Sequence, residues 1–192
     1  VRSGKNQYLN EESSIYLSGG GAHNSNSQKS EYDFNNILAP LLADSLRRKN
    51  ILPIILYRET YTLLPEQVND TKADLCISLH CNAFNKKTVG AEVLYHHSSK
   101  NGKKLAKLIV DQVAGCLGEN NRGAKPIDYK HTGSKGDKGG WLVEKTAMPT
   151  VIVEPFFIDN DKSLQVATEK RGELANVIAS AIKTYLNERL KA

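Results

Sequence analysis

The sequence predicts an α/β fold, a single three-layer αβα domain with a twisted, mostly parallel but mixed sheet of about six strands and helices on both faces. Short apolar runs rich in β-branched residues alternate with segments of helical periodicity, as in strands joined by helices. The length of 192 residues suits one domain. Two successive strands expected near the C-terminal third favour a mixed sheet. We assign residues 1–192 to one domain, with a core over about 14–190 and a polar N-terminal extension over 1–13.

The first elements surround a polar loop. A strand is expected over 15–20, followed by a loop over 21–30 that is rich in Gly, Asn and Ser. A helix then starts near Ser30, which can form an N-terminal cap with Asp33. Pro40 lies inside this helix and should bend it. The residues that define the buried face by their spacing are Phe34, Ile37, Leu38, Leu41, Leu42, Ser45 and Leu46.

The middle of the chain alternates between strands and helices. A strand is expected over 51–57, where Pro53 favours an edge position or a place early in the strand. A short helix over 64–72 leads to a strand over 75–80. After Gly90, another strand is expected over 91–95.

The last third contains a glycine-rich basic stretch. A helix over 103–117 precedes residues 120–140, whose five glycines and five Lys/Arg residues predict a long, mobile surface loop. Short strands are expected over 141–144 and 150–154. Helices follow Asn160, and the last of them has the clearest apolar face in the chain.

Composition narrows the class of protein. Apolar residues make up 40% and charged residues 24%, as in globular proteins, and no apolar run approaches the roughly 20 residues of a membrane span. We therefore expect no membrane insertion, and no signal peptide is visible. The net charge of +5 favours an anionic partner. No nucleic-acid-binding motif accompanies this charge, so we do not expect nucleic acid as the partner.

The three cysteines do not form a recognisable framework. Cys76, Cys81 and Cys116 are an odd number and lack a Cys-x-x-Cys spacing, which argues against disulfides and against an all-cysteine zinc site. Cys81 lies next to His80 and points to the opposite face if the strand continues. This direction argues against Cys81 as a metal ligand, and we assign Cys76 and Cys116 to packing.

Three apolar runs end at residues that can bind a metal or move a proton. The run at Ile15 leads through glycines to His23, the run at Leu75 ends at His80, and the run at Val151 ends at Glu154. Ligands of open α/β sheets bind at the carboxyl ends of the strands. Two histidines and a carboxylate are a frequent ligand set of catalytic zinc, so the pattern predicts a hydrolytic metal site.

Two glutamates occupy unusual positions in this pattern. Glu31 is spaced three and seven residues from Phe34 and Leu38, so it shares the buried face of its helix, where a carboxylate needs a partner. Glu154 follows Val-Ile-Val and precedes Pro155, and burial there would raise the pKa of its carboxyl towards the range useful for acid–base catalysis. We interpret Glu31 as a metal ligand and Glu154 as the proton carrier.

In combination, these residues resemble the zinc-dependent N-acetylmuramoyl-L-alanine amidases of the amidase 3 type, which occur in autolysins and phage endolysins. The resemblance extends from Ile15 to about Leu186 and is closest to the compact catalytic domains of phage endolysins. The family's usual Gly-His-Gly-Gly becomes Ala22-His23-Asn24-Ser25 here. The segments that carry the resemblance are Gly21-Ala22-His23, Glu31, Ser78-Leu79-His80-Cys81-Asn82-Ala83, Gly90 to Tyr95, Arg122 to Lys125 and Pro149 to Phe157 with Asn160.

The resemblance implies a reaction and a site. The amide between the lactyl group of N-acetylmuramic acid and the L-alanine of the stem peptide would be cleaved by water at the fourth position of the zinc. His23, Glu31 and His80 would hold Zn²⁺, and Glu154 would act as general base and acid. The residues that we expect to contact substrate are Asn82, Glu92, Arg122 and Lys125, with His131 on the same basic stretch.

Three other functions also fit parts of this sequence. A non-catalytic peptidoglycan-binding module, a zinc peptidase acting within the stem peptide and a basic nucleic-acid binder all fit parts of the pattern. His96 and His97 could form an extra metal site or a polar surface pair. We expect a monomer that acts on peptidoglycan at the bacterial cell wall, either secreted or periplasmic, or encoded by a phage and made in the host cytoplasm.

Overall fold

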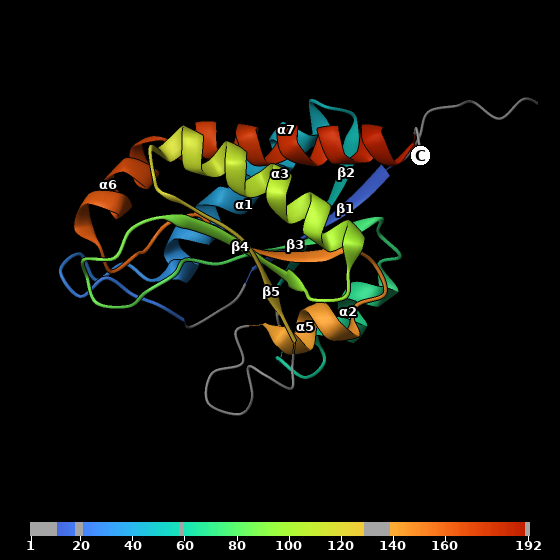
Figure 1. The fold of residues 1–192 in the computed structure, drawn as a ribbon, viewed down its shortest axis with the longest axis horizontal. Coiled ribbons are helices and arrows are strands. Elements are labelled where there is room, and N and C mark those ends of the chain that lie inside the picture. The colour runs from blue at the N-terminus through green and yellow to red at the C-terminus, as the bar shows by residue number, and fades with distance from the viewer. Residues whose placement is uncertain (1–10, 18–20, 58–59, 129–138, 191–192) are drawn as a thin grey trace, which may run out of the picture.

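A six-stranded sheet lies between two layers of helices (Figure 1). The computed structural model describes residues 11–17, 21–57, 60–128 and 139–190. The strands, in chain order, are β1 (Glu11–Leu17), β2 (Ile51–Tyr57), β3 (Leu75–Leu79), β4 (Ala91–His96), β5 (Asn121–Ile127) and β6 (Thr150–Glu154). Across the sheet their order is β2-β1-β3-β6-β4-β5. The pair β4–β6 is antiparallel and the other neighbours are parallel, which confirms the mixed sheet.

Helices cover both faces of the sheet, as predicted. The helices of the described residues are α1 (Glu31–Arg47), α2 (Leu64–Asp70), α3 (Lys100–Leu117), α5 (Gly140–Lys145), α6 (Asp161–Glu169) and α7 (Arg171–Arg189). α7 packs against α1 and α3 on one face, and α2 packs against α5 on the other (Figure 1). Within the described part of the chain, no helix has the length and apolarity needed to cross a membrane.

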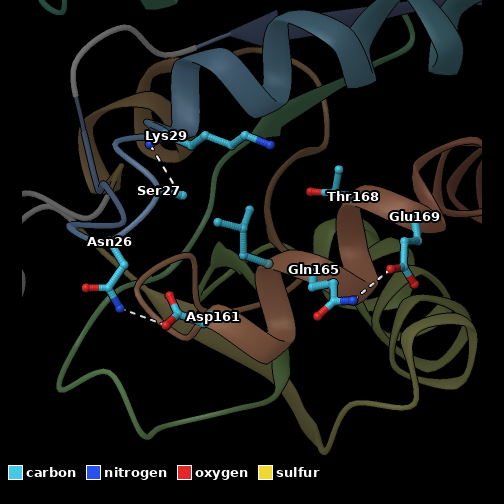
Figure 2. Close-up of a pocket in the computed structure, with 8 residues that line it drawn as sticks. Asn26, Ser27, Lys29, Asp161, Gln165, Thr168 and Glu169 are labelled. Atoms are coloured by element: carbon cyan, nitrogen blue, oxygen red, sulfur yellow. Dashed lines mark hydrogen bonds between the residues drawn. The ribbon is translucent and has the colours of Figure 1, made fainter.

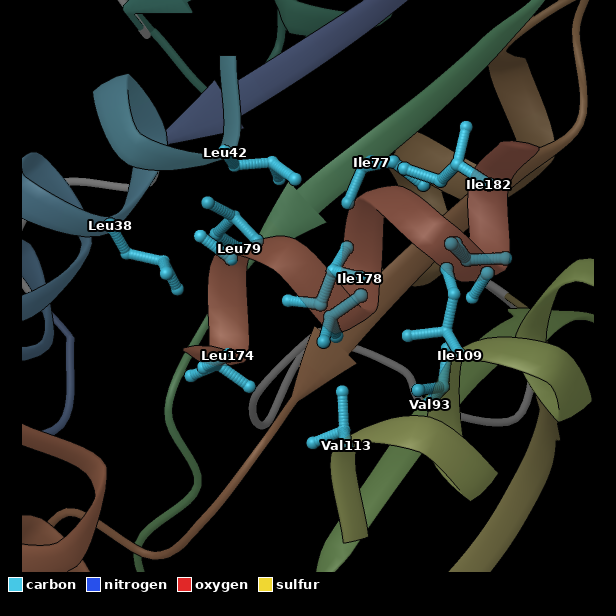
Figure 3. Close-up of a cluster of buried hydrophobic side chains, with 14 of the residues drawn as sticks. Leu38, Leu42, Ile77, Leu79, Val93, Ile109, Val113, Leu174, Ile178 and Ile182 are labelled. Carbon is cyan, nitrogen blue, oxygen red and sulfur yellow. The ribbon is translucent and has the colours of Figure 1, made fainter. Parts of the chain in front are cut away.

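The main hydrophobic core fills the space between the sheet and α1, α3 and α7 (Figure 3). Every residue of β3 is buried, as expected for a central strand covered on both faces. The core side chains labelled in Figure 3 are Leu38, Leu42, Ile77, Leu79, Val93, Ile109, Val113, Leu174, Ile178 and Ile182. A smaller cluster, formed by Leu64, Val68, Cys76 and Leu142, packs under α2 and α5. This core fixes β3 and α1, the two elements that carry candidate site residues.

α1 begins where the sequence places it. The Ser30 hydroxyl accepts a hydrogen bond from the Asp33 N–H, and the Asp33 carboxylate accepts one from the Ser30 N–H, which completes the capping box. Pro40 lies within the helix on its exposed side. Ile37 is 50% exposed, so its expected burial was wrong: the buried arc is displaced towards Ala39. The cap sets the position of Glu31 directly after it.

β1 and β5 correct two sequence predictions. β1 begins at Glu11, so the expected N-terminal extension overlaps the strand over 11–13. The long loop expected over 120–140 was wrong in its first part, because β5 pairs with β4 at the sheet edge. An edge strand has one neighbour and half-exposed faces, so polar residues are compatible with it. Residues 129–138 lie outside the described part of the chain.

The expected strand over 141–144 is also wrong, because these residues belong to α5. A four-residue apolar run does not distinguish a strand from a buried helical turn. Gly139 precedes the helix with φ +85°, a conformation that favours glycine. The sheet is mixed for another reason, since β4 runs antiparallel to β6.

Candidate metal centre and active site

The candidate residues gather where β3 and β6 end. This edge is the side of the sheet formed by these strand ends, not an edge strand. His80 follows the last residue of β3, Glu154 is the last residue of β6, and the two strands are parallel neighbours. The His80 N–H donates to the Val153 carbonyl at 3.0 Å. Because β4 runs in the opposite direction, its beginning lies at the same edge, and Glu92 is directly opposite Glu154 in the register. Strand direction therefore gathers groups from three strands.

Glu31 and His80 form the closest pair at this edge. Glu31 Oε1 lies 3.3 Å from His80 Nδ1, and Glu31 is only 3% exposed. The other ring nitrogen of His80 lies 3.1 Å from the hydroxyl oxygen of Ser78. Two ligands of one tetrahedral zinc, each bound at about 2.0–2.2 Å, stand roughly 3.3–3.5 Å apart. The separation of these two atoms therefore fits a shared zinc ion.

The Glu31 carboxylate lies against the backbone of Gly21. A Cβ atom at Gly21 would lie 2.6 Å from Glu31 Oε1, closer than side-chain carbons approach. The Glu31 N–H donates to the Ala22 carbonyl at 2.8 Å, which ties this segment to the start of α1. Gly21, two residues before the candidate ligand His23, therefore leaves room for the Glu31 carboxylate that a larger residue would not.

His23 is placed near the pair by its backbone. It forms an isolated antiparallel bridge with Ser30, next to Glu31. Its side chain is exposed, and the described residues contain no group of three His, Cys, Asp or Glu side chains arranged to hold a metal ion. The structure therefore brings Glu31 and His80 into contact and leaves the side chain of His23 outside that pair.

Buried polar groups stabilise the edge. Asn35 is fully buried in α1, and its side-chain amide donates to the Leu79 carbonyl at 3.1 Å, one residue before His80. Glu154 is half-buried, with its Oε2 atom shielded from solvent. Sequence reasoning missed Asn35, although it lies four residues after Glu31 and so falls on the same helical face.

Cys81 is buried beside the carboxylates. Burial, together with the negative charges of Glu31 and Glu154, raises the pKa of the Cys81 thiol well above its ordinary value. Burial also raises the pKa of Cys76, to about 12. Both thiols therefore stay protonated at neutral pH, as expected of buried cysteines that serve packing.

A chain of polar contacts extends from the edge towards β5. The Asn82 amide donates to Glu92 Oε1 at 2.6 Å, and Arg122 Nε donates to Glu92 Oε2 at 2.8 Å. The Arg122 guanidinium lies over the Phe157 ring, 5.1 Å from its centroid. Three of the four expected substrate-contact residues thus meet beside Glu154. The fourth, Lys125, pairs with Leu94 in the interior of the β4–β5 ladder, away from this edge.

The other histidines are remote from this edge. His96 ends β4 at the opposite edge of the sheet, and its ring lies 4.6 Å from the ring of His97. His97 Nδ1 lies 3.9 Å from a carboxylate oxygen of Asp128. His96 also contributes to a separate cavity of about 560 Å³. His131 lies outside the described residues.

Sequence reasoning missed the anchor of the loop that follows His23. Asn24 is 1% exposed, and its amide donates to Asp161 Oδ1 at 2.8 Å and to the Ile158 carbonyl at 3.0 Å. Asn26 donates to Asp161 Oδ2 at 2.7 Å. The hydrogen bonds from Asn24 and Asn26 lower the pKa of the Asp161 carboxyl. The only signal in the sequence is the Asn-rich loop, because the partner is 137 residues away.

A cavity of about 470 Å³ opens between this loop and α6 (Figure 2). Its lining residues are Asn26, Ser27, Lys29, Asp161, Leu164, Gln165, Thr168 and Glu169. Gln165 and Glu169 are hydrogen-bonded to each other along α6 at 2.9 Å. None of His23, Glu31, His80 and Glu154 lines this cavity.

Comparison with known proteins identifies a family. The Amidase_3 family model, described as N-acetylmuramoyl-L-alanine amidase, matches residues 9–184. The N-acetylmuramoyl-L-alanine amidase LytC of Bacillus subtilis is 29% identical over 137 residues, which are 68% of this chain and 25% of LytC. The chain thus spans about a quarter of the length of that relative, and about half of a germination-specific amidase of the same organism.

Solved structures share the fold. The CwlD amidase of Clostridioides difficile, solved in complex with the GerS lipoprotein, is 25% identical with a TM-score of 0.76, and the match covers 91% of this chain and 98% of that one. The catalytic domain of CD27L, an endolysin targeting Clostridia difficile, is 26% identical with a TM-score of 0.71, over 90% and 96% of the two chains. The expected resemblance to endolysin catalytic domains is confirmed.

Proposed function

Because the chain belongs to the N-acetylmuramoyl-L-alanine amidase family, we propose that it is a zinc-dependent peptidoglycan hydrolase. The bond that it cleaves is the amide between the lactyl group of N-acetylmuramic acid and the L-alanine of the stem peptide. The observation that carries the proposal is the 3.3 Å contact between Glu31 Oε1 and His80 Nδ1 at the edge that also holds Glu154.

His23, Glu31 and His80 would hold the zinc. The spacing of the Glu31 and His80 atoms supports this assignment, because it matches that of two ligands of one ion. The His23 side chain is exposed, so it can change rotamer towards the ion without breaking core packing. Bound zinc would supply a Lewis acid that polarises the amide carbonyl and makes water a better nucleophile at neutral pH.

Glu154 is the proton carrier of the proposed reaction. It takes a proton from the attacking water and delivers one to the departing alanine nitrogen, since an amine leaves only after protonation. Glu92 is the neighbouring carboxylate, but hydrogen bonds from Asn82 and Arg122 occupy both of its oxygens. The register of β4 and β6 places Glu154 opposite Glu92, so we assign the acid–base role to Glu154 and the orientation of the muramyl peptide to the Asn82–Glu92–Arg122 chain.

The remaining features agree with action at a bacterial cell wall. The net charge of +5 favours encounter with an anionic wall polymer, and this attraction weakens as salt is added. We propose that the protein acts there as a monomer, whether it is secreted, periplasmic, or encoded by a phage and made in the host cytoplasm.

The proposal is tested by digestion of purified peptidoglycan with the zinc-loaded protein and identification of the new chain ends by mass spectrometry. We expect new N-terminal L-alanine, which disappears after treatment with a chelator and returns on addition of zinc. New ends elsewhere in the stem peptide would instead identify a peptidase. Binding to peptidoglycan without new ends would indicate a non-catalytic module.

A further inference from the structure

A loop beside the candidate site presents an aromatic side chain to solvent. Phe84 is 77% exposed, more than any other large apolar side chain of the described residues. It follows Asn82 by two residues and His80 by four, at the carboxyl end of β3. The mechanism proposed above gives this ring no role.

The backbone of this loop is fixed by residues that follow β6. Asp159 Oδ2 accepts hydrogen bonds from the N–H groups of Phe84 at 3.0 Å and Lys86 at 2.8 Å. The Asn160 amide donates to the Lys86 carbonyl at 3.1 Å. Asn85 Oδ1 accepts two further N–H groups within the loop. An aromatic ring on a fixed backbone loses little conformational entropy when a ligand packs on it.

The loop also connects the two sides of the site. The Asn82 N–H donates to the Phe156 carbonyl, which ties the beginning of the loop to the segment after Glu154. Lys86 Nζ donates to the Ser25 hydroxyl at 2.7 Å, which ties its middle to the loop that begins at His23. The loop that bears the exposed ring thus borders the proposed active site on both sides.

We propose that Phe84 is a stacking platform for a sugar ring of the peptidoglycan glycan strand, an inference that rests on the proposed function. The lactyl group whose carbonyl reacts is attached directly to the sugar, so a sugar ring lies within a few bonds of the reacting carbon. A sugar ring has an apolar C–H face that packs on an aromatic face. The first stem residue, alanine, offers only a methyl group, so the glycan is the better occupant.

The direct test is a binding titration of the zinc-loaded protein with soluble glycan strands from which the stem peptides have been removed, followed by NMR. We expect the Phe84 and Asn85 amide signals to shift, and Phe84→Ala to weaken binding about tenfold. Phe84→Tyr should restore it. The control is Leu52→Ala, which removes a 50% exposed apolar side chain from β2, and it should bind like the parent.

Equal glycan binding by Phe84→Ala would overturn the inference, as would signal shifts with a free stem peptide and none with the glycan. Hydrolysis of intact peptidoglycan gives a second readout, in which Phe84→Ala should raise KM about tenfold and leave kcat unchanged. Failure of the parent protein to release L-alanine would contradict the proposed function alone. An unchanged KM in Phe84→Ala, with normal L-alanine release, would contradict the stacking role alone.

Discussion

Glu31 shows how a single position combines burial with chemistry. The helical spacing that places it on the face of Phe34 and Leu38 also predicts its burial, and the structure gives 3% exposure. A carboxylate buried in this way needs a cation or strong hydrogen-bond donors. Its contact with His80 and its fit against Gly21 are properties of the folded chain that the spacing alone does not contain.

The substitution Gly21→Ala tests whether this fit sets the metal site. The added methyl group would collide with the Glu31 carboxylate and displace it from His80 Nδ1. We expect zinc affinity to fall about tenfold or more, as when groups that orient ligands are changed, measured by competition with a chromogenic chelator. Gly115→Ala is the control, because a Cβ at Gly115 meets no atom within 4 Å. Equal affinities in both variants would show that Gly21 is not needed for the site.

The substitution Glu154→Gln tests the assignment of the proton carrier. The amide keeps the shape of the side chain but cannot accept the proton of the attacking water. We expect zinc binding and thermal stability to be retained, while hydrolysis falls about 10²- to 10⁴-fold. Retention of full activity would remove Glu154 from the mechanism.

The substitution His80→Ala tests the metal ligand. We expect loss of stoichiometric zinc, measured by atomic absorption after dialysis, together with loss of hydrolysis. His96→Ala at the opposite edge of the sheet is the matched control and should keep both. Full zinc occupancy in His80→Ala would place the metal elsewhere.

At the scale of elements, the start of α6 anchors the loop that follows His23. Asp161 receives hydrogen bonds from Asn24 and Asn26, and its pKa is lowered from an ordinary value of 3.8. A group whose pKa is lowered by folding stabilises the fold above its ordinary pKa. That contribution is lost as the pH falls through the lowered value.

The substitution Asp161→Asn should therefore reduce stability at neutral pH, and the difference from the parent should shrink as the pH is lowered below about 3.8. Thermal unfolding of both proteins across this pH range measures the effect. Asp70→Asn, in which an exposed carboxylate at the end of α2 is replaced, is a comparison outside this anchor. A difference between parent and Asp161→Asn that does not vary with pH would contradict an ionised anchor.

Elements with strong periodicity or clear caps could be predicted, and short ones could not. The Ser30 and Asp33 pattern places the start of α1 correctly, and Pro53 correctly indicates that β2 is an edge strand. β5 was missed because its polar sequence is compatible with a loop, and its existence depends on hydrogen bonds to β4. α5 was missed because a four-residue apolar run carries no period.

At the scale of the whole molecule, strand direction decides which residues meet. The sequence indicated that His80 and Glu154 both lie at carboxyl ends of strands, and the structure adds that β3 and β6 are parallel neighbours. The antiparallel direction of β4 brings Glu92 and Arg122 to the same edge. Sequence spacing gave no reason for their contact, because the two residues come from separate strands.

The packing on the two faces of the sheet also predicts how the cysteines react. Cys76 and Cys81 are buried on opposite faces of the sheet, in the small and the main core respectively, whereas Cys116 is partly exposed. We expect the native protein to react with a thiol reagent at Cys116 alone, and the unfolded protein to react at all three. Mass spectrometry of the labelled peptides makes the comparison. Rapid native labelling of Cys81 would contradict the packing beside Glu31 and Glu154.

The most direct test of the proposed metal centre is an anomalous difference map, recorded at the zinc absorption edge from crystals of the zinc-loaded protein. We predict one strong peak about 2.0–2.2 Å from Glu31 Oε1 and His80 Nδ1, with the His23 ring turned to complete the ligand set. A strong peak elsewhere, such as at His96 and His97, with none between Glu31 and His80, would contradict the account.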